Sequence, residues 1–417
     1  MTQAILREII DYANRADPYP LYEELRKTPV SHEGDGPYVV STYYEIQSLL
    51  HDPRISSDRR NLTSKEGDPL AQAEEEETTL PPAFLNLDPP EHDRLRRMTN
   101  RPFGPPHSPH RVHDMRGELG GIVSGLVDGI VAAGNGDGFD RIDLVDQFSY
   151  PFPVSVICRL LGVPPEDEPR FHVWADALAA SLDPDPDADP SQRHKGSTDV
   201  RMELGMYLAG LIEERRKSPG DDMLSHLATA EGPDGSMTTM EVLSTSALLL
   251  VAGHETTVNL ITNGMLTLLR HPDVLRRLRE DPALAVPLVE ELLRYEPPVQ
   301  LLPQRSTLAD IEVAGVSIPK GASLWLILAS GNRDPQRYED PDRFDPDRTD
   351  IQHLGLGSGI HSCFGAPLAR LEAQLALSEL ARRLENPRLL EDPPPYRQNA
   401  VLRGPRHLPI ACDGIRD

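Results

Sequence analysis

The stretch TTMEVLSTSALLLVAGHETTVNLITNGMLTLLRHP, residues 238–272, constrains the fold of this chain more than any other feature. Thr238 and Glu241 have the spacing of a helix capping box at its start, and Pro272 would stop the helix at its end. At about 1.5 Å per residue, such a helix crosses an entire domain. Because most of its residues are apolar, we expect it to be buried. Its middle nevertheless contains residues 254–257, HETT, and buried polar side chains need partners or a function.

The rest of the chain predicts further helices, which prolines separate, and one small sheet. Prolines number 41, about twice the usual share of roughly 5%. Helical patterns cover residues 16–29, the second half of 37–53, and 366–387, and the alternation and Gly/Pro turns of 308–335 predict the sheet. Dense Pro and Asp predict loops at 64–92, 181–198 and 332–350. We therefore expect a mainly α fold with a small β portion.

Composition and charge narrow the class of protein. The 417 residues are 38% hydrophobic and 26% charged, as in globular proteins, and they suffice for one large domain or for two or three smaller ones. The formal net charge of −24 argues against nucleic acid or an anionic membrane as the main partner, because both bind through clustered Lys and Arg. A basic patch on such a chain would therefore be notable.

The N-terminal segment and the cysteines bear on localisation. The first residues lack the basic segment and long apolar run of a signal peptide, and the longest apolar stretch is far below the roughly 20 residues that span a bilayer. Cys158, Cys363 and Cys412 have neither metal-ligand spacing nor the even number of a disulfide set. We expect a cytoplasmic protein without membrane or nucleic-acid partners.

The segment GLGSGIHSCFGAP, residues 355–367, surrounds one cysteine with glycines. Cys363 precedes a predicted helix, whose N-terminal amides should lower the thiol pKa below about 8.5 and favour the thiolate. Gly357, Gly359 and Gly365 permit positive φ angles and leave no Cβ in the way of a large flat group. A thiolate beneath a flat cofactor is the haem ligand of oxygen-activating enzymes, so we interpret Cys363 as the iron ligand.

With these motifs the chain resembles the cytochrome P450 family, in its soluble bacterial form, over residues 1–417 as a single domain. The family's cysteine loop, F-x-x-G-x-H-x-C-x-G, occurs here as LGSGIHSCFG, with Leu356 in place of the usual phenylalanine and Phe364 as a candidate to fill the space. AGHETT at 252–257 matches the oxygen-activating helix motif, and ELLR supplies the E-x-x-R pair. The resemblance implies the cytochrome P450 fold and haem b, with Gly357 and Gly365 beside it.

The resemblance also implies roles for charged residues. His92, Arg96, Arg305 and His361 occupy the family's positions for the haem propionates. Glu291 and Arg294 match the pair that braces the cysteine loop, and Arg343 in DPDRF is the arginine expected to join them. Glu255 and Thr256 match the acid and alcohol that deliver protons during dioxygen cleavage, with Gly253 leaving room for oxygen. A helical threonine otherwise bonds the carbonyl oxygen four residues back.

Family position and helix periodicity predict an apolar, medium-to-large substrate pocket. Its predicted lining comes from three loops and one face of the long helix: Phe84, Leu85, Leu248, Leu249, Ala252, Val299, Leu301, Leu302, Val401 and Leu402. Residues 181–198 lie where the family has its access lid. These positions do not identify the substrate.

The resulting function is a haem-thiolate monooxygenase that inserts one atom of O2 into a largely apolar small molecule, by hydroxylation or epoxidation in secondary metabolism. The resemblance implies electrons from a ferredoxin, with ferredoxin reductase and NAD(P)H. Arg94, Arg97 and Arg101, spaced i, i+3, i+7, are either its docking patch or scattered surface arginines. Two alternatives remain: a peroxide-using or coupling enzyme of the same fold, and a haem-free scaffold that recruits partners.

Overall fold

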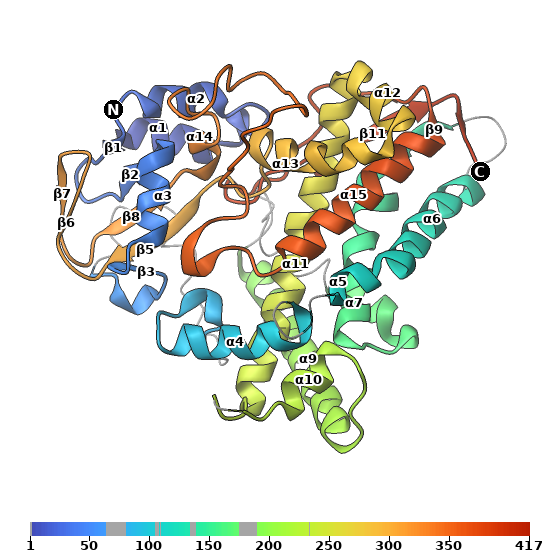
Figure 1. Ribbon diagram of the computed structural model, residues 1–417, viewed down its shortest axis with the longest axis horizontal. Helices are drawn as coiled ribbons and strands as arrows, with labels where there is room; N and C mark the ends of the chain where they lie inside the picture. Colours follow the sequence, from blue (N-terminus) through green and yellow to red (C-terminus); the bar gives the residue numbers. More distant parts are fainter. Residues whose placement is uncertain are drawn as a thin grey trace.

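A computed structural model describes residues 2–63, 81–104, 108, 110–133, 139–174, 190–232 and 234–417. Figure 1 shows a large helical part and, beside it, a smaller part that contains most of the sheet. The mainly α class with a small β portion is confirmed. None of the described helices is long and apolar enough to cross a membrane.

The helical part is arranged around α11 (Thr239–Arg270), which runs through its middle (Figure 1). The helices of this part are α4 (Glu91–Phe103), α5 (Arg111–Asp114), α6 (Arg116–Ala133), α7 (Pro151–Leu161), α9 (Pro190–Lys217), α10 (Met223–Thr229), α12 (Pro272–Glu280), α13 (Ala285–Tyr295) and α15 (Ala366–Arg383). The capping box of Thr238 and Glu241 is present, as predicted. Most apolar side chains of α11 belong to the main core, which explains why this helix tolerates so few charges.

The sheet part contains five strands in the order β1-β2-β8-β5-β3. These are β1 (Val30–Ser31), β2 (Tyr38–Val40), β8 (Ser323–Leu326), β5 (Leu302–Thr307) and β3 (Ile55–Ser56), and the helices beside them are α1 (Thr2–Ile10), α2 (Tyr19–Arg26), α3 (Tyr43–His51) and α14 (Leu328–Gly331). Leu324 and Leu326 pack into one apolar cluster, whereas Trp325 packs into another. The alternation shows that the centre of the sheet is covered on both faces.

Short strands complete the molecule. The hairpin β6 (Ile311–Val313) and β7 (Val316–Ile318) extends from the sheet part, β10 (Arg388–Leu389), β11 (Pro409–Cys412) and β4 (Phe139–Asp143) form a second sheet, and β9 (Leu384–Glu385) pairs with β12 (Gly414–Ile415). Strands β4 and β10 pair with β11, and β9 pairs with β12, so these short strands hold the C-terminal segment in place.

The predicted segments agree with the structure in most places. Helix α4 begins at Glu91, inside the predicted loop 64–92, and α14 lies inside the segment 308–335 that was predicted as sheet. The helices and strands expected in 16–29, 37–53 and 308–335 are present, and no described residue of 332–350 lies in a helix or strand. The loop prediction for 181–198 was wrong for 190–198, which begin α9 with Pro190 in the first turn, a position that suits proline. Residues 181–189, like 64–80 of another predicted loop, lie outside the described residues. Helix α15 ends at Arg383, where β9 begins, and not at 387.

Candidate active site

The loop before α15 has a shape that requires glycine at two positions. Gly357 and Gly359 have φ angles of 66° and 68°, which side chains with a Cβ rarely adopt. A Cβ on Gly359 would also clash with the carbonyl oxygen of Leu50 in α3. The Cys363 N–H donates to the Leu356 carbonyl oxygen at 2.8 Å and closes the loop. For Gly365 the predicted need for a positive φ angle was wrong, because its φ is −78°. A Cβ added to Gly365 would meet no described atom within 4 Å, so the space beside this residue is open.

The surroundings of the Cys363 sulfur act on its pKa in opposite directions. Burial raises the pKa of the thiol and outweighs the backbone N–H groups of Gly365 and Ala366 and the charge of Arg96, which lower it. Cys363 is nevertheless exposed to solvent along part of its side chain. The backbone amides at the helix start act in the predicted direction, but the predicted net lowering of the Cys363 pKa was wrong. A coordinated metal deprotonates a thiol outright, so iron binding does not depend on that prediction.

Four cationic or ionisable groups from three separate segments meet beside this loop. Arg96 of α4 donates to the carbonyl oxygens of Ile360 and Ser362, at 2.8 and 2.5 Å, on either side of His361. The rings of His92 and His361 lie 4.4 Å apart. Arg305 of β5 is close enough for its charge to act on His361. The structure thus brings together all four residues predicted to hold the propionates.

This group of residues, the cation cluster, has unused capacity for an anion. Burial, with the charges of His92, Arg305 and Arg96, lowers the pKa of His361 to about 3, and burial lowers that of Arg305 to about 10. Among the residues that the structure describes, Nε2 of His92 and Nδ1 of His361 are buried and have no hydrogen-bond partner. Within the described part of the chain, neither Arg305 nor His361 forms an ion pair with a carboxylate. Two buried propionates would supply the missing charge and acceptors, so these residues fit haem.

A buried network on α13 braces the cysteine loop. Glu291 and Arg294 are fully buried and joined by two hydrogen bonds of 2.7 and 2.8 Å. Arg294 also donates to the Asn332 carbonyl oxygen at 3.0 Å. The side chain of Asn332 in turn accepts from the Leu354 N–H at 2.7 Å, directly before the loop. The network therefore acts on the shape of the cysteine loop and not on a substrate.

The arginine that joins this network is Arg348, so the prediction for Arg343 was wrong. The Arg343 side chain is 64% exposed and pairs with Asp345, and only its carbonyl oxygen accepts from Arg294, at 3.1 Å. The Arg348 side chain is 11% exposed, and its Nε lies 3.6 Å from Glu291 Oε2. The sequence RFDPDR offers both arginines five residues apart, and only the packing of the loop distinguishes them.

Two polar residues in the middle of α11, Glu255 and Thr256, have defined partners. Thr256 donates from Oγ1 to the Ala252 carbonyl oxygen at 2.6 Å, the bond expected of any helical threonine. The carboxylate of Glu255 is buried and lies 2.8 Å from Arg397 Nε. A Cβ on Gly253 would lie 2.8 Å from Ile157 Cδ1, so this glycine also lets α7 approach, and α11 is continuous there. Arg397 was not predicted, because no local motif marks it.

The predicted substrate residues divide into two groups. Val299 and Leu402 form an isolated β-bridge, which joins two of the predicted loops. Leu85 and Ala252 are exposed, and Leu248, Leu302, Val401 and Leu402 are partly buried. Leu301 is fully buried in the cluster under α1 and α2, Leu249 is nearly so in the main core, and the Phe84 ring lies 6.0 Å from that of Phe364. The second group is thus packed against protein.

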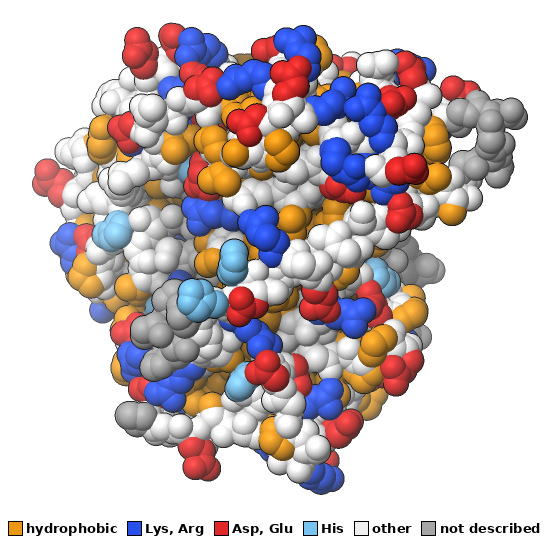
Figure 2. Space-filling view, turned by 45° about the vertical axis from the view of Figure 1, so that its right-hand side comes forward, with side chains coloured by type: hydrophobic (Ala, Val, Ile, Leu, Met, Phe, Trp, Pro, Cys, Tyr) orange, Lys and Arg blue, Asp and Glu red, His pale blue; other side chains and the backbone are white. Residues whose placement is uncertain are grey.

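The arginines on the other face of α4 are already paired. Arg94 pairs with Glu241, Arg97 with Asp234 at 2.9 Å, and Arg101 with Asp234 at 3.4 Å. They tie α4 to the first turn of α11 and to the segment before it, and are not an uncompensated basic patch. Basic and acidic side chains are also interspersed over the face drawn in Figure 2.

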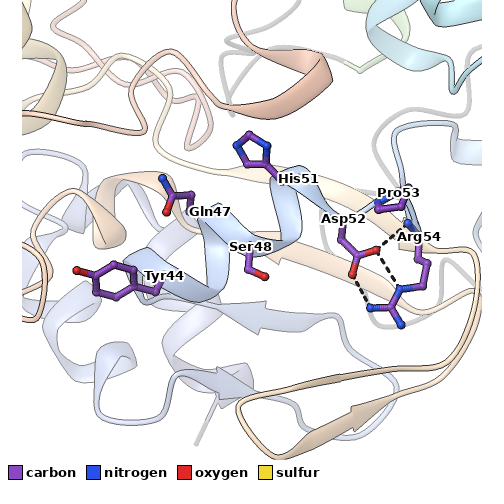
Figure 3. Close-up of a pocket in the computed structure, with 7 residues that line it drawn as sticks. All are labelled: Tyr44, Gln47, Ser48, His51, Asp52, Pro53 and Arg54. Atoms are coloured by element: carbon purple, nitrogen blue, oxygen red, sulfur yellow. Dashed lines mark hydrogen bonds and ion pairs between the residues drawn. The ribbon is translucent and has the colours of Figure 1, made fainter.

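An open hollow on α3 lies beside the cysteine loop (Figure 3). His51 Nε2 lies 2.7 Å from Ser358 Oγ and connects α3 to this loop. Asp52 and Arg54, which line the hollow, are bonded to each other at 2.6 Å, as the dashed lines show. The hollow is therefore connected to the cysteine loop through His51. The charges of Asp52 and Arg54 compensate each other, so this pair leaves no net charge for a ligand.

Comparisons with known proteins agree with this geometry. The sequence model of the cytochrome P450 family matches residues 171–287 and 283–409. Cytochrome P450 monooxygenase PikC from Streptomyces venezuelae is 42% identical over 405 residues, which are 95% of this chain and 91% of that protein. Vitamin D(3) 25-hydroxylase from Pseudonocardia autotrophica is 37% identical over 403 residues, 94% of this chain and 93% of that protein.

A solved structure shows the same fold. The cytochrome P450 PksS of the bacillaene polyketide synthase from Bacillus subtilis 168 matches with a TM-score of 0.85 at 30% identity, over 97% of this chain and 99% of that chain. The chain therefore belongs to the cytochrome P450 family. It is a cytochrome P450 monooxygenase, and its cofactor is haem b, which the family holds through a cysteine thiolate.

Proposed function

We propose that this monooxygenase uses Cys363 as its haem ligand and hydroxylates or epoxidises a medium-to-large, largely apolar small molecule of secondary metabolism. The observation that carries the proposal is the cation cluster beside Cys363, in which the buried Nε2 of His92 and Nδ1 of His361 have no hydrogen-bond partner among the described residues. When bound, haem supplies the redox chemistry by which two electrons and two protons reduce O2, with one oxygen atom entering the product and the other leaving as water.

The residues of the chain hold the cofactor and move protons. The Cys363 sulfur would hold the haem iron, and Arg96, Arg305, His92 and His361 would hold its propionates. The Thr256 hydroxyl lies on the exposed side of α11, where it can exchange its bond to Ala252 for one to dioxygen or water. Glu255, one residue earlier, accepts a proton from water and passes it on. Positioned proton donors of this kind typically contribute about 10²–10⁴-fold.

The substrate class rests on the apolar residues of the predicted pocket and on the relatives. Val299 and Leu402, with Leu85, Leu248 and Ala252, present apolar surface from three loops and α11. One relative is named for vitamin D3, and another belongs to a polyketide synthase. Vitamin D3 is therefore a suitable first probe of the pocket.

A ferredoxin is the proposed electron donor, and it would dock on the face of the cysteine loop, near Arg94, Arg97 and Arg101. Because these arginines already have carboxylate partners, we expect each to contribute less than an uncompensated charge would. Arg97, whose side chain is 58% exposed, is the best placed of the three. Arg97→Glu should slow the first electron transfer at low salt, whereas equal rates would exclude Arg97 from docking.

The experiment that tests the proposed function adds vitamin D3 to the ferric protein and follows the spin state of the haem. Turnover is then measured with NADPH, a surrogate ferredoxin and its reductase. We expect a shift to high spin and hydroxylated product that depends on NADPH and O2. Product formed with hydrogen peroxide but not with NADPH and O2 would favour the peroxide-using alternative. Correctly folded protein that binds no haem would favour the scaffold.

A further inference from the structure

One face of α11 carries three buried polar residues that neither packing nor the dioxygen motif requires together. Glu255, Asn259 and Asn263 are spaced i, i+4, i+8, so they lie in a row along the helix. Their exposed fractions are 3%, 0% and 2%. Buried polar side chains in such a row need polar partners on the element that they face.

That element is the segment 396–405, which we call the C-terminal hairpin. The hairpin is closed at its base by a β-bridge between Tyr396 and Pro405 and by a bond of 3.0 Å from the Arg397 N–H to the Gly404 carbonyl oxygen. At its tip, Asn399 Oδ1 accepts from the N–H groups of Val401 and Leu402, at 2.8 and 3.0 Å. These bonds fix the shape of the hairpin from base to tip.

Each of the three polar residues in the row on α11 contacts the base of the C-terminal hairpin. Arg397 Nε lies 2.8 Å from Glu255 Oε1. Asn259 packs closely on Gly404, because a Cβ added to Gly404 would clash with the Oδ1 atom of Asn259. Asn263 donates from Nδ2 to the Arg403 carbonyl oxygen at 3.0 Å.

The tip of the same hairpin reaches a predicted substrate loop. Leu402 forms the β-bridge with Val299, and the Gln300 N–H donates to the Val401 carbonyl oxygen at 2.9 Å. The residues proposed to contact substrate and the arginine that contacts Glu255 therefore belong to one braced unit of ten residues.

We propose that Arg397 is a positioning residue for Glu255, and that the C-terminal hairpin thereby makes proton delivery depend on the position of a substrate-contacting loop. This inference rests on the proposed function of Glu255. Arg397 holds the carboxylate in a fixed place, and Glu255 passes a proton only when this contact rearranges. Nη2 of Arg397 and Oδ1 of Asn259 are buried and have no hydrogen-bond partner within the described residues, so the cluster retains groups with which to rearrange.

The test compares Arg397→Gln with Arg406→Gln, a matched control. Arg406 lies just beyond the same hairpin, and its side chain is 45% exposed and pairs with Asp146 outside the site. Product from vitamin D3 is measured per NADPH consumed, together with hydrogen peroxide per O2. The same variants are then supplied with iodosylbenzene, which transfers one oxygen atom and leaves as iodobenzene, so that neither protons nor electrons are needed.

We expect R397Q to lower product per NADPH by about tenfold, within the roughly 10–100-fold typical of groups that orient functional residues. Hydrogen peroxide per O2 should rise, iodosylbenzene-driven product should stay unchanged, and R406Q should match the wild type. R397K should fall between the wild type and R397Q. Adding R397Q to E255Q should cause no further loss, because Arg397 acts through Glu255.

Three results would overturn the proposal. These are wild-type coupling in haem-loaded R397Q, an equal loss of iodosylbenzene-driven product, and a further loss in E255Q/R397Q. If R397Q does not fold, the test uses R397K instead. Product per NADPH equal to that of the wild type in R397K would then contradict the proposal.

If the proposed substrate class is wrong, the experiment gives a different result from those that would overturn the role of Arg397. Wild-type protein that converts vitamin D3 with neither oxidant would remove that class. Hydrogen peroxide per O2 in substrate-free protein still tests Arg397, and an equal ratio in wild type and R397Q would contradict its role.

Discussion

The two buried glutamate–arginine pairs, Glu291–Arg294 on α13 and Glu255–Arg397 between α11 and the C-terminal hairpin, differ in how fully the arginine is bonded. Arg294 uses Nε and both terminal nitrogens, which donate to Glu291 and to three carbonyl oxygens. One terminal nitrogen of Arg397, Nη2, is buried and forms no hydrogen bond to any residue in the described ranges. Both pairs are removed from water, so the difference lies in hydrogen bonding and not in burial.

This difference in hydrogen bonding indicates a structural role for the pair on α13 and a functional role for the pair on α11. A buried ion pair with every donor satisfied can only hold its neighbours, because any movement would leave a charge uncompensated. A buried pair with an unused donor can exchange partners at a lower cost. We therefore assign the α13 pair to holding the cysteine loop and the α11 pair to moving protons.

The largest expected effect is on protein stability, on substitution of Arg294 in the fully hydrogen-bonded pair Glu291–Arg294. Arg294→Gln removes several hydrogen bonds and leaves the buried Glu291 carboxylate without its bidentate partner, with only the more distant Arg348 beside it. Removing one partner of a buried ion pair typically costs about 3–5 kcal/mol. We expect little folded, haem-containing protein, measured by haem absorbance per polypeptide and by thermal unfolding. Normal haem content and stability would show that the network on α13 does not hold the loop.

On α11, in contrast, removing a polar group should spare the fold. Thr256→Ala loses only a hydroxyl that is bonded within the helix. Since positioned donors contribute about 10²–10⁴-fold, we expect product per NADPH to fall by at least about tenfold while the spin shift with vitamin D3 is retained. Unchanged coupling would mean that protons reach dioxygen by another route.

A comparison of two arginines sharpens the account of the α13 network. Arg348 lies beside Glu291, so Arg348→Gln should destabilise the protein by about 1–3 kcal/mol, the usual range for leaving a buried group unsatisfied. Arg343→Gln should leave stability unchanged, because that side chain points to solvent. Both variants are compared by chemical denaturation, and the reverse order of stability would restore Arg343 to the network.

The smallest expected effect concerns Leu356, which departs from the family's phenylalanine. Leu356 is partly buried, and Phe364 instead stacks on Phe103 at 4.6 Å. Leu356→Phe should change stability by less than about 1.5 kcal/mol. It should still shift the ferric/ferrous midpoint potential, because bonding and solvent near the sulfur tune the iron. An unchanged midpoint would identify Leu356 as a packing variant only.

Local signals sufficed for much of the fold and of the site. The capping box at Thr238 and the apolar run after it predict α11 because both operate within a few residues. The cation cluster was predicted from motifs that lie far apart in the chain, and the structure brings its four members together. In these cases each residue is recognisable from its own neighbours in sequence.

Partners set by tertiary packing could not be predicted. Arg348 and Arg343 stand in the same short motif, and only the path of the loop turns one of them towards Glu291. The pKa of Cys363 depends on how many protein atoms surround the sulfur, which no helix-start argument contains. Arg397 lies over a hundred residues from Glu255 in sequence, so the pair exists only in three dimensions.

The measurement that tests the central claim most directly is the absorption spectrum of the reduced protein under carbon monoxide. If Cys363 holds the iron as a thiolate, the Soret band lies far to the red of that of a histidine-ligated carbonyl haem, and Cys363→His abolishes the red-shifted band in folded protein. A wild-type band at the position for histidine ligation, or a red-shifted band that survives in Cys363→His, would contradict the account.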